Sequence, residues 1–351
     1  MEKTLVRIKD IATKAGVSVG TVDRVLHNRG RVSPEAKTKV KAALKELNYR
    51  PNFIARALGA SKKYCIAVLV PDPNNDPYWT EPYNGITQAE HDFNSHGIII
   101  DKYTFNQFDP VSFTQQAKLL LKKAYDGILL APLFYQQYLL FAQDCVDRKI
   151  PLILFNTNID NFSVLSYIGQ DSYQSGRLAA HLLYYPLRAF SGKVIIMHLA
   201  EDPESAAQLM KKEKGFKDYF ENDTDKPGFI TLSVNTPVQK TLIAQLDSTF
   251  NVYHDISAIF VTTSKAYEIA AYLEAVGLSH ILLIGFDMVE ENVNYLEKGV
   301  IDFIINQNAY QQGYAGVARF VDHLILKKEV QPKMYLPLDV ITKENFHYYL
   351  H

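Results

Sequence analysis

The sequence predicts a small all-α domain at the N-terminus, followed by a two-lobed α/β domain built on doubly wound parallel sheets. Three observations support this fold class. The chain has 351 residues, too many for one ordinary core. Its charge is divided, with net +10 over residues 1–63 and net −11 over the rest, although the total is only −1. After residue 63, short apolar stretches alternate with amphipathic ones, which is typical of parallel α/β sheets.

Composition excludes several classes of protein. A hydrophobic content of 47% supplies enough apolar side chains for packed cores and excludes a disordered chain. The two cysteines, Cys65 and Cys145, are too few for a disulfide framework and indicate a reducing compartment. The start MEKTLVRIKD lacks the apolar stretch of a signal peptide, and no run approaches the roughly 18 apolar residues of a membrane span. We therefore expect a cytoplasmic protein with no membrane partner.

The basic segment over residues 1–50 has the pattern of a helix-turn-helix domain. Its first apolar positions recur at helical spacing: Ile8, Ile11, Ala12 and Ala15. Gly16 predicts the end of this helix, and Ser18 predicts the N-cap of a second one. In a helix-turn-helix the second helix enters the DNA major groove. The net positive charge favours DNA binding over the alternative of a merely solvated basic tail.

A third helix completes the predicted headpiece. Ser33 followed by Pro34 gives it a capped start with proline at the first helical position. Its apolar stripe consists of Val40, Ala43, Leu44 and Leu47. Three short helices of this kind can close a small core.

The second helix carries the residues that we expect to read DNA. Arg24 is suited to bidentate contact with guanine, Thr21 to a base or a thymine methyl group, and Ser18 to a phosphate. Gly20 marks either a close approach of the backbone to DNA or a tolerated weakness in the helix. Asp23 either orients Arg24, which we favour, or accepts from a cytosine amine. Further DNA contacts are expected from Val19, His27, Asn28 and Arg31.

A hinge helix and linker are predicted over residues 51–62. Pro51 breaks the preceding helix, and Asn52 can cap a short helix that ends near Gly59. Such a helix is too short to be stable alone in water, so we expect it to fold on contact with DNA. Arg56 and Leu58 on its outer face fit a wedge in the minor groove, while a flexible linker is the alternative.

The run IKDIATKAGVSVGTVDRVLHNRGRVSPEAKTKVKAALKELNYRPNFIARAL resembles the headpiece and hinge helix of the LacI/GalR family of bacterial transcription regulators. The resemblance implies that Val19, Gly20, Thr21 and Arg24 read the major groove. It also implies that Leu58 inserts into the minor groove at the operator centre. Asp23 stands where a serine is usual in the family, which leaves the operator sequence open.

Eight strands are predicted in the larger domain, residues 63–351. They are CIAVLV, IIIDKY, GILLAP, PLILFN, KVIIMHL, ITLSV, ISAIFVT and HILLIGFD, with helical stretches between them. This number suggests two lobes. We place the N-lobe at about residues 63–168 and 306–330, and the C-lobe at about 169–305 and 331–351.

Polar and aromatic residues follow several of these strands, at the edge where parallel sheets bind ligands. The candidates are Asp72, Asn74, Asp76, Tyr78, Trp79, Asn156, Asn158, Asp171 and Asp287. Carboxylates and amides can hydrogen-bond vicinal hydroxyls, and an aromatic face can pack on a pyranose, so the set favours a sugar or polyol. For any single residue the alternative is a cap or turn.

The order of these elements resembles the two-lobed effector domain of the same family, which is similar to periplasmic sugar-binding proteins. The resemblance implies that Asp287 hydrogen-bonds ligand hydroxyls, that Gln307 lines the cleft at a crossover, and that Trp79 stacks on the ligand. Lys212 occupies the place of a usual arginine, and Thr263 with Ser264 replaces a common Asn-Asp pair. We therefore expect a pocket that differs from the usual one of the family, so the identity of its ligand cannot be inferred from other members.

No catalytic or phosphate-binding motif is present, and the histidines lack metal-ligand spacing, so we expect no enzyme activity, cofactor or metal. The sequence predicts a homodimeric repressor that binds a pseudo-palindromic operator and responds to a small ligand. The tail FHYYLH is too short for a tetramerising coiled coil. The alternatives are a purine-responsive corepressor-type regulator of the same fold, or a sugar-binding receptor without DNA function.

Overall fold

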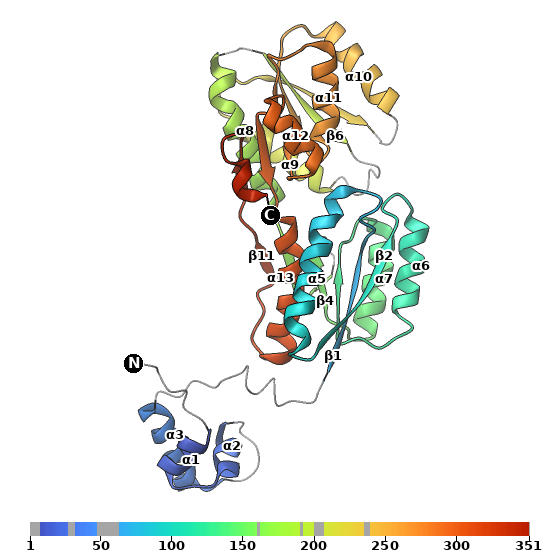
Figure 1. Ribbon diagram of the computed structural model, residues 1–351. Coiled ribbons are helices and arrows are strands. Elements are labelled where there is room, and N and C mark those ends of the chain that lie inside the picture. Colours follow the sequence, from blue (N-terminus) through green and yellow to red (C-terminus); the bar gives the residue numbers. More distant parts are fainter. Residues whose placement is uncertain are drawn as a thin grey trace. The chain divides into compact units, whose positions relative to one another are not determined.

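The computed structural model describes residues 8–26, 32–47, 63–159, 162–189, 192–199, 207–234 and 239–350. The chain divides into two compact units, Met1–Gly59 and Ala60–His351 (Figure 1). The division falls inside the segment predicted as hinge and linker.

The smaller unit contains the three predicted helices, α1 (Ile8–Ala15), α2 (Val19–Leu26) and α3 (Pro34–Glu46). Gly16 ends α1 with a φ of 64°, a conformation that glycine adopts without strain. Both predicted caps form: Ser18 Oγ accepts from the Thr21 amide at 3.1 Å and Ser33 Oγ from the Ala36 amide at 3.3 Å. The core that closes the unit consists of Ile11, Ala12, Ala15, Val22, Val40 and Ala43.

The larger unit contains two six-stranded sheets, which confirms the predicted pair of lobes. The first sheet has the order β11-β5-β4-β3-β1-β2 and consists of Tyr64–Pro71 (β1), Ile98–Phe105 (β2), Gly127–Leu130 (β3), Leu152–Phe155 (β4), Ser166–Gly169 (β5) and Lys333–Tyr335 (β11). The second has the order β12-β10-β9-β8-β6-β7 and consists of Lys193–Leu199 (β6), Gly228–Val234 (β7), Ile256–Val261 (β8), Leu282–Phe286 (β9), Phe303–Asn306 (β10) and Asp339–Ile341 (β12). Neighbouring strands are parallel except β12, which runs antiparallel to β10.

All eight predicted strands are confirmed. The four strands that were not predicted, β5, β10, β11 and β12, have only three or four residues each. Segments this short show no periodicity that distinguishes a strand from a loop. The equally short β3 and β4 were predicted from the apolar runs GILLAP and PLILFN that contain them.

Helices cover both faces of each sheet. In the first lobe, α5 (Thr80–Asn94) and α13 (Ala309–Phe320) share a core on one face, and α6 (Pro110–Leu120) and α7 (Tyr135–Asp147) share one on the other. The second lobe has α8 (Ser172–Ala189) and α9 (Ala207–Tyr219) on one face. Its other face carries α10 (Gln239–Val252), α11 (Ala266–Val276) and α12 (Glu290–Lys298).

The chain passes between the lobes three times. After β5 it continues into α8, which packs on α9, and after β10 it continues into α13, which packs on α5 (Figure 1). The third crossing is later than predicted. We expected the N-lobe to end at about residue 330, but β11 still pairs with β5, so the chain returns to the second sheet only between Tyr335 and Asp339.

Candidate ligand cavity and DNA-reading helix

Helix α2 presents the predicted DNA-reading residues. Val19 is 49% exposed, Gly20 and Arg24 are exposed, and Thr21 is half-buried, whereas Val22 faces the core. The Nε atom of Arg24 donates to the Gly20 carbonyl oxygen at 3.0 Å, so the guanidinium lies back along the helix towards its N-terminus. This is the end of a recognition helix that contacts base edges.

Gly20 is not required by the packing of the smaller unit. A Cβ atom at this position would lie 3.8 Å from Nη2 of Arg24 and 3.9 Å from Oγ of Ser18, which are ordinary contacts. The reason for a glycine must therefore lie either in the approach of DNA or in a tolerated weakness of the helix.

Six predicted DNA contacts lie outside the described residues: His27, Asn28, Arg31, Asn52, Arg56 and Leu58. The predicted hinge helix lies there as well. These assignments stay predictions.

A cavity of about 180 Å³ is lined by residues from both lobes of the larger unit. Nine of the thirteen candidate ligand residues line it. Seven of them are Tyr78, Trp79, Asn156, Lys212, Thr263, Asp287 and Gln307. Asp76 and Ser264 line it too. Asp76, Tyr78, Trp79, Asn156 and Asp287 were selected because they follow strands, and the other four were implied by the family resemblance.

Four candidate residues, Asp72, Asn74, Asn158 and Asp171, do not line the cavity. Asp72 instead accepts hydrogen bonds from the backbone and side-chain nitrogens of Asn74, at 2.9 and 2.8 Å, and both residues belong to a turn. Asp171 accepts from the Gln174 amide at 3.1 Å at the start of α8. Asp72, Asn74 and Asp171 thus make local hydrogen bonds of the kind found in turns and caps, and their role in ligand binding stays a prediction.

Trp79 belongs to a rigid aromatic wall. Only 3% of it is exposed, and its ring centroid lies 5.0 Å from that of Tyr78 and 6.3 Å from that of Phe155. Its Nε1 donates to Oε1 of Gln107 at 2.7 Å, and Nε2 of Gln107 donates to Oδ2 of Asp76 at 3.0 Å. Each partner holds the next in place, so the wall is fixed by hydrogen bonds as well as by packing.

Gln107 was missed by the sequence analysis. It comes two residues after β2, so the same strand-end rule that selected Asn156 could have found it. Other lining residues that were not predicted are Leu133, Thr157, Leu199, Gln208, Leu209, Thr262 and Lys265.

Asp287 and Lys212 form the buried charged part of the cavity. Burial raises the pKa of Asp287 to about 6, although Lys212 and two hydrogen bonds from Gln307 oppose the shift. These bonds come from the Gln307 backbone amide at 3.2 Å and its Nε2 at 2.5 Å. Burial lowers the pKa of Lys212 to about 8, and the nearby Asp287 opposes this. At neutral pH the two groups are thus oppositely charged.

The Lys212 ammonium group is held on three sides. It donates to the Thr262 carbonyl oxygen at 2.9 Å and to Oε1 of Gln307 at 3.3 Å, and it lies 3.5 Å from the centre of the Phe286 ring. The cation–π contact and the two acceptors compensate in part for its burial.

Contacts between the lobes occur beside the cavity. Nε2 of Gln208 donates to the Asn156 carbonyl oxygen at 2.9 Å, and Nζ of Lys265 lies 4.0 Å from Oδ2 of Asp76. The lining therefore contains two carboxylates and two ammonium groups, with amides and hydroxyls around them. Such a balanced, hydrogen-bonding surface suits an uncharged molecule with several hydroxyl groups.

Neither a metal centre nor a membrane helix is found in the part of the chain that the structure describes. Among these residues, no three His, Cys, Asp or Glu side chains gather to hold a metal ion. No helix among them has the length and apolar character needed to cross a membrane.

Both the helix-turn-helix unit and the larger α/β unit match known protein families. Residues 7–52 match the lacI family of bacterial regulatory proteins, and residues 66–328 match the periplasmic binding protein domain. Catabolite control protein A of Staphylococcus xylosus is 27% identical over 53% of this chain and 54% of its own length. The transcriptional regulator MalR of Streptococcus pneumoniae is 30% identical over 49% of this chain and 51% of its own. The chain thus spans about half the length of these curated relatives.

The matching solved structures cover a larger share of this chain than the curated relatives do. A protein from Bacteroides fragilis, assigned as a LacI transcriptional regulator, is 30% identical, with a TM-score of 0.74 over 82% of this chain and 100% of that one. A glucose-galactose binding protein from Geobacillus stearothermophilus shares the fold at 21% identity, with a TM-score of 0.72 over 81% of this chain and 99% of that one. This chain belongs to the lacI family of bacterial regulatory proteins, with a periplasmic-binding-protein domain as its larger unit.

Proposed function

We propose that the chain is a sequence-specific DNA-binding repressor whose operator affinity is controlled by a sugar or polyol bound in the cavity. The observation that supports the proposal is a charge-balanced cavity lined by both lobes. The same chain also contains a helix-turn-helix unit. We further propose that it acts as a cytoplasmic homodimer and has no enzymatic activity. Family membership and the absence of catalytic motifs in the sequence support this.

The cavity surface supports a neutral, hydroxyl-rich ligand. Asp287 and Asn156 offer acceptors from opposite lobes, while Lys212 offers a donor. Leu133, Trp79 and other apolar side chains cover part of the wall and can contact the C–H face of a sugar ring. A purine would use the aromatic wall but few of the charged groups, so the polyol is favoured.

Ligand control follows from linkage between the two sites. A ligand can weaken operator binding only by the difference in its affinity for the DNA-competent and incompetent states, typically about 1–3 kcal/mol. In a homodimer, ligand-dependent movement of the lobes would change the spacing of the two headpieces. Half-sites roughly one helical turn apart are sensitive to such a change.

Titration calorimetry on the full chain tests the ligand class. The probes are D-glucose, D-galactose, D-ribose, D-arabinose, myo-inositol, hypoxanthine and guanine, each added separately. We expect saturable binding of a sugar or of the inositol and none of the nucleobases. Binding of a nucleobase alone would replace the proposal with a purine-responsive corepressor of the same fold.

Selection of bound duplexes from a random-sequence DNA pool tests the DNA function. We expect a pseudo-palindromic sequence whose affinity falls when the bound sugar is added. Asp287→Ala should retain operator binding and lose the sugar response, because the side chain lies in the cavity and not in the helix-turn-helix unit. An unchanged sugar response in this variant contradicts the proposal, and failure to select any sequence would favour a sugar-binding receptor without DNA function.

A further inference from the structure

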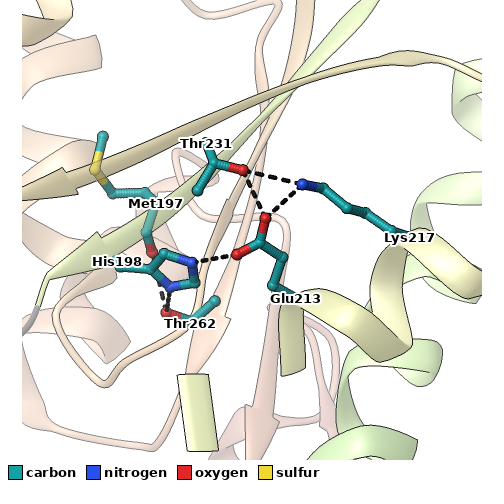
Figure 2. Close-up of polar contacts among 6 residues, drawn as sticks. All are labelled: Met197, His198, Glu213, Lys217, Thr231 and Thr262. Carbon is teal, nitrogen blue, oxygen red and sulfur yellow. Dashed lines mark hydrogen bonds and ion pairs between the residues drawn. The ribbon is translucent and has the colours of Figure 1, made fainter. Parts of the chain in front are cut away.

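His198 and Glu213 form a buried hydrogen-bonded pair (Figure 2). His198 on β6 and Glu213 on α9 are each only 5% exposed, and Nε2 of His198 lies 2.7 Å from Oε2 of Glu213. The other oxygen of Glu213 accepts from Oγ1 of Thr231 at 2.6 Å and from Nζ of Lys217 at 2.5 Å. Neither His198 nor Glu213 lines the cavity.

The hydrogen-bond pattern fixes the role of each atom in the pair. The hydrogen bond from His198, followed by those from Lys217 and Thr231, lowers the pKa of Glu213 to about 2 against the effect of burial. The carboxylate therefore has no proton to donate, and Nε2 of His198 must be the donor. Nδ1 of His198 faces Oγ1 of Thr262 at 2.8 Å.

Thr262 connects this pair to the cavity. Its hydroxyl lies between Nδ1 of His198 and the Met197 carbonyl oxygen, which is 3.2 Å away. Its own carbonyl oxygen accepts from Lys212 at 2.9 Å. The hydroxyl of Thr262 thus contacts the buried pair, and its carbonyl oxygen positions Lys212, which lines the cavity.

The chain of hydrogen bonds continues across the cavity floor. Because Oε1 of Gln307 accepts from Lys212, the amide is oriented with Nε2 towards Asp287, to which it donates at 2.5 Å. An unbroken series of hydrogen bonds therefore joins Glu213 to Asp287. It passes through His198, Thr262, Lys212 and Gln307.

Stability alone does not explain such a pair. The cost of removing a carboxylate and its polar partner from water offsets their attraction, and apolar side chains of similar size commonly stabilise a core as well or better. Apart from Lys193 and His198, β6 is apolar. His198 is on the same face as Val194 and Ile196, where a leucine would extend the core. A polar pair at this position is better explained by what it orients.

We propose that His198 and Glu213 are positioning residues of the ligand cavity, which fix the Thr262 carbonyl and, through it, the Lys212 ammonium and the Gln307 amide. The class of ligand that this cavity binds rests on the proposed function. The hydrogen bonds that hold the cavity wall in place do not depend on that class.

Amide hydrogen exchange of the full chain without any sugar provides the first test. The variants are His198→Phe, which loses both contacts, and Glu213→Gln, which keeps the size of the side chain but loses its charge. Tyr272→Phe is the matched control, because it removes a hydrogen bond of 2.8 Å to Asp247 in the same lobe but outside the series. We expect exchange of the Gln307 amide, which donates to Asp287, to rise about tenfold in the two test variants and to stay unchanged in the control.

Ligand affinity provides the second test, with D-glucose, D-galactose, D-ribose, D-arabinose and myo-inositol as probes. For any probe that binds the unmodified chain, we expect the dissociation constant to rise about tenfold or more in Glu213→Gln and His198→Phe, since small misplacements of binding groups are costly. His198→Gln, which can still donate to Glu213, should recover part of the loss.

The two tests separate the possible failures. Unchanged exchange at Gln307 in both test variants overturns the positioning role, whatever the ligand. Increased exchange with an unchanged dissociation constant also overturns it, because the pair would then support the fold alone. If no probe binds the unmodified chain, the sugar proposal fails while the exchange result still decides the positioning role. If His198→Phe does not fold, Glu213→Gln decides alone.

Discussion

Asn156 and Asp287 occupy equivalent positions in the two lobes. Each is the first residue after the third strand in the order of its sheet, β4 or β9, and each has a left-handed backbone, with φ of 64° and 67°. The Asn156 amide donates to the Ile168 carbonyl oxygen at 3.1 Å, and the Asp287 amide donates to the Ile305 carbonyl oxygen at the same distance. Asn and Asp tolerate this conformation better than most residues, so each lobe places a polar side chain at the corresponding position on its own side of the cavity.

The only tryptophan of the chain should report ligand binding directly. Trp79 lines the cavity, and its indole N–H is hydrogen-bonded to Gln107, so a ligand that contacts this wall changes the surroundings of the fluorophore. We expect a saturable change in tryptophan emission on addition of the sugar identified by calorimetry, with the same dissociation constant. Loss of the change in urea-unfolded protein is the control. Calorimetric binding without any change in emission would place the ligand away from Trp79.

Much of the cavity could be predicted because the carboxyl ends of parallel strands meet at one edge. Asn156 and Asp287 follow from this rule. It also selected Asp72 and Asn74, which do not line the cavity, because the rule cannot tell whether the chain after a strand turns back on itself, as it does here. The contact between His198 and Glu213 could not be predicted, since the two residues are 15 positions apart on different elements and no spacing indicates it.

The lobe boundary shows a similar limit. The segment KMY gives no strand signal of its own, and only its pairing with β5 assigns it to the first sheet. In contrast, the caps at Ser18 and Ser33 were predictable because each depends on a neighbour three residues away. Interactions local in sequence could be read from it, whereas those between distant elements could not.

Replacement of Asp287 by asparagine should change how stability depends on pH. Burial raises the pKa of Asp287 from 3.8 to about 6, so between these values the native state binds more protons than the unfolded state. The free energy of unfolding of the unmodified chain should therefore fall, relative to Asp287→Asn, as pH rises from about 4 to about 6. The full difference is at most about 3 kcal/mol.

Urea unfolding of both proteins between pH 4 and pH 7, followed by the emission of Trp79 in the larger unit, measures this difference. Asp302→Asn provides a comparison away from the cavity. Burial also raises the pKa of Asp302, but this residue does not line the cavity. If the difference between Asp287→Asn and the unmodified chain is constant over this range, Asp287 does not titrate within it.

Substitution of Arg24 should relax DNA specificity as well as weaken binding. Its guanidinium is exposed on α2 and lies towards the helix N-terminus. If it contacts a guanine in a bidentate manner, Arg24→Ala should cost about 1–3 kcal/mol per half-site on the selected operator and less on duplexes changed at that base. Fluorescence anisotropy at fixed salt measures both.

Lys39→Ala is the matched control for Arg24→Ala. Lys39 is an exposed basic residue of the same unit, and its ammonium pairs with Glu35 at 2.8 Å on α3. Its loss should leave the preference among duplexes unchanged. An equal loss of affinity on every duplex in Arg24→Ala would show that Arg24 contacts phosphate and not a base.

A methyl group added between the paired helices of either lobe should lower the free energy of unfolding by a similar amount. A Cβ on Gly85 of α5 would lie 2.0 Å from the Tyr310 carbonyl oxygen on α13, and a Cβ on Gly176 of α8 would lie 1.9 Å from the Lys212 carbonyl oxygen on α9. Because backbone atoms are in the way, the helices must separate to admit a methyl group. Gly85→Ala and Gly176→Ala should each lower the free energy of unfolding by about 1–3 kcal/mol.

The Gly176 variant should have an additional effect that the Gly85 variant lacks. Its new methyl group pushes against the backbone of Lys212 itself, whose ammonium group lines the cavity, so the dissociation constant for the bound sugar should rise further in Gly176→Ala. Gly20→Ala tests the same change where there is room, with the nearest side-chain atom 3.8 Å away, and should leave stability unchanged or slightly raised. Thermal unfolding and calorimetry of the three variants measure these effects. Equal sugar affinity in Gly85→Ala and Gly176→Ala would mean that the position of α9 does not set the position of the Lys212 ammonium group.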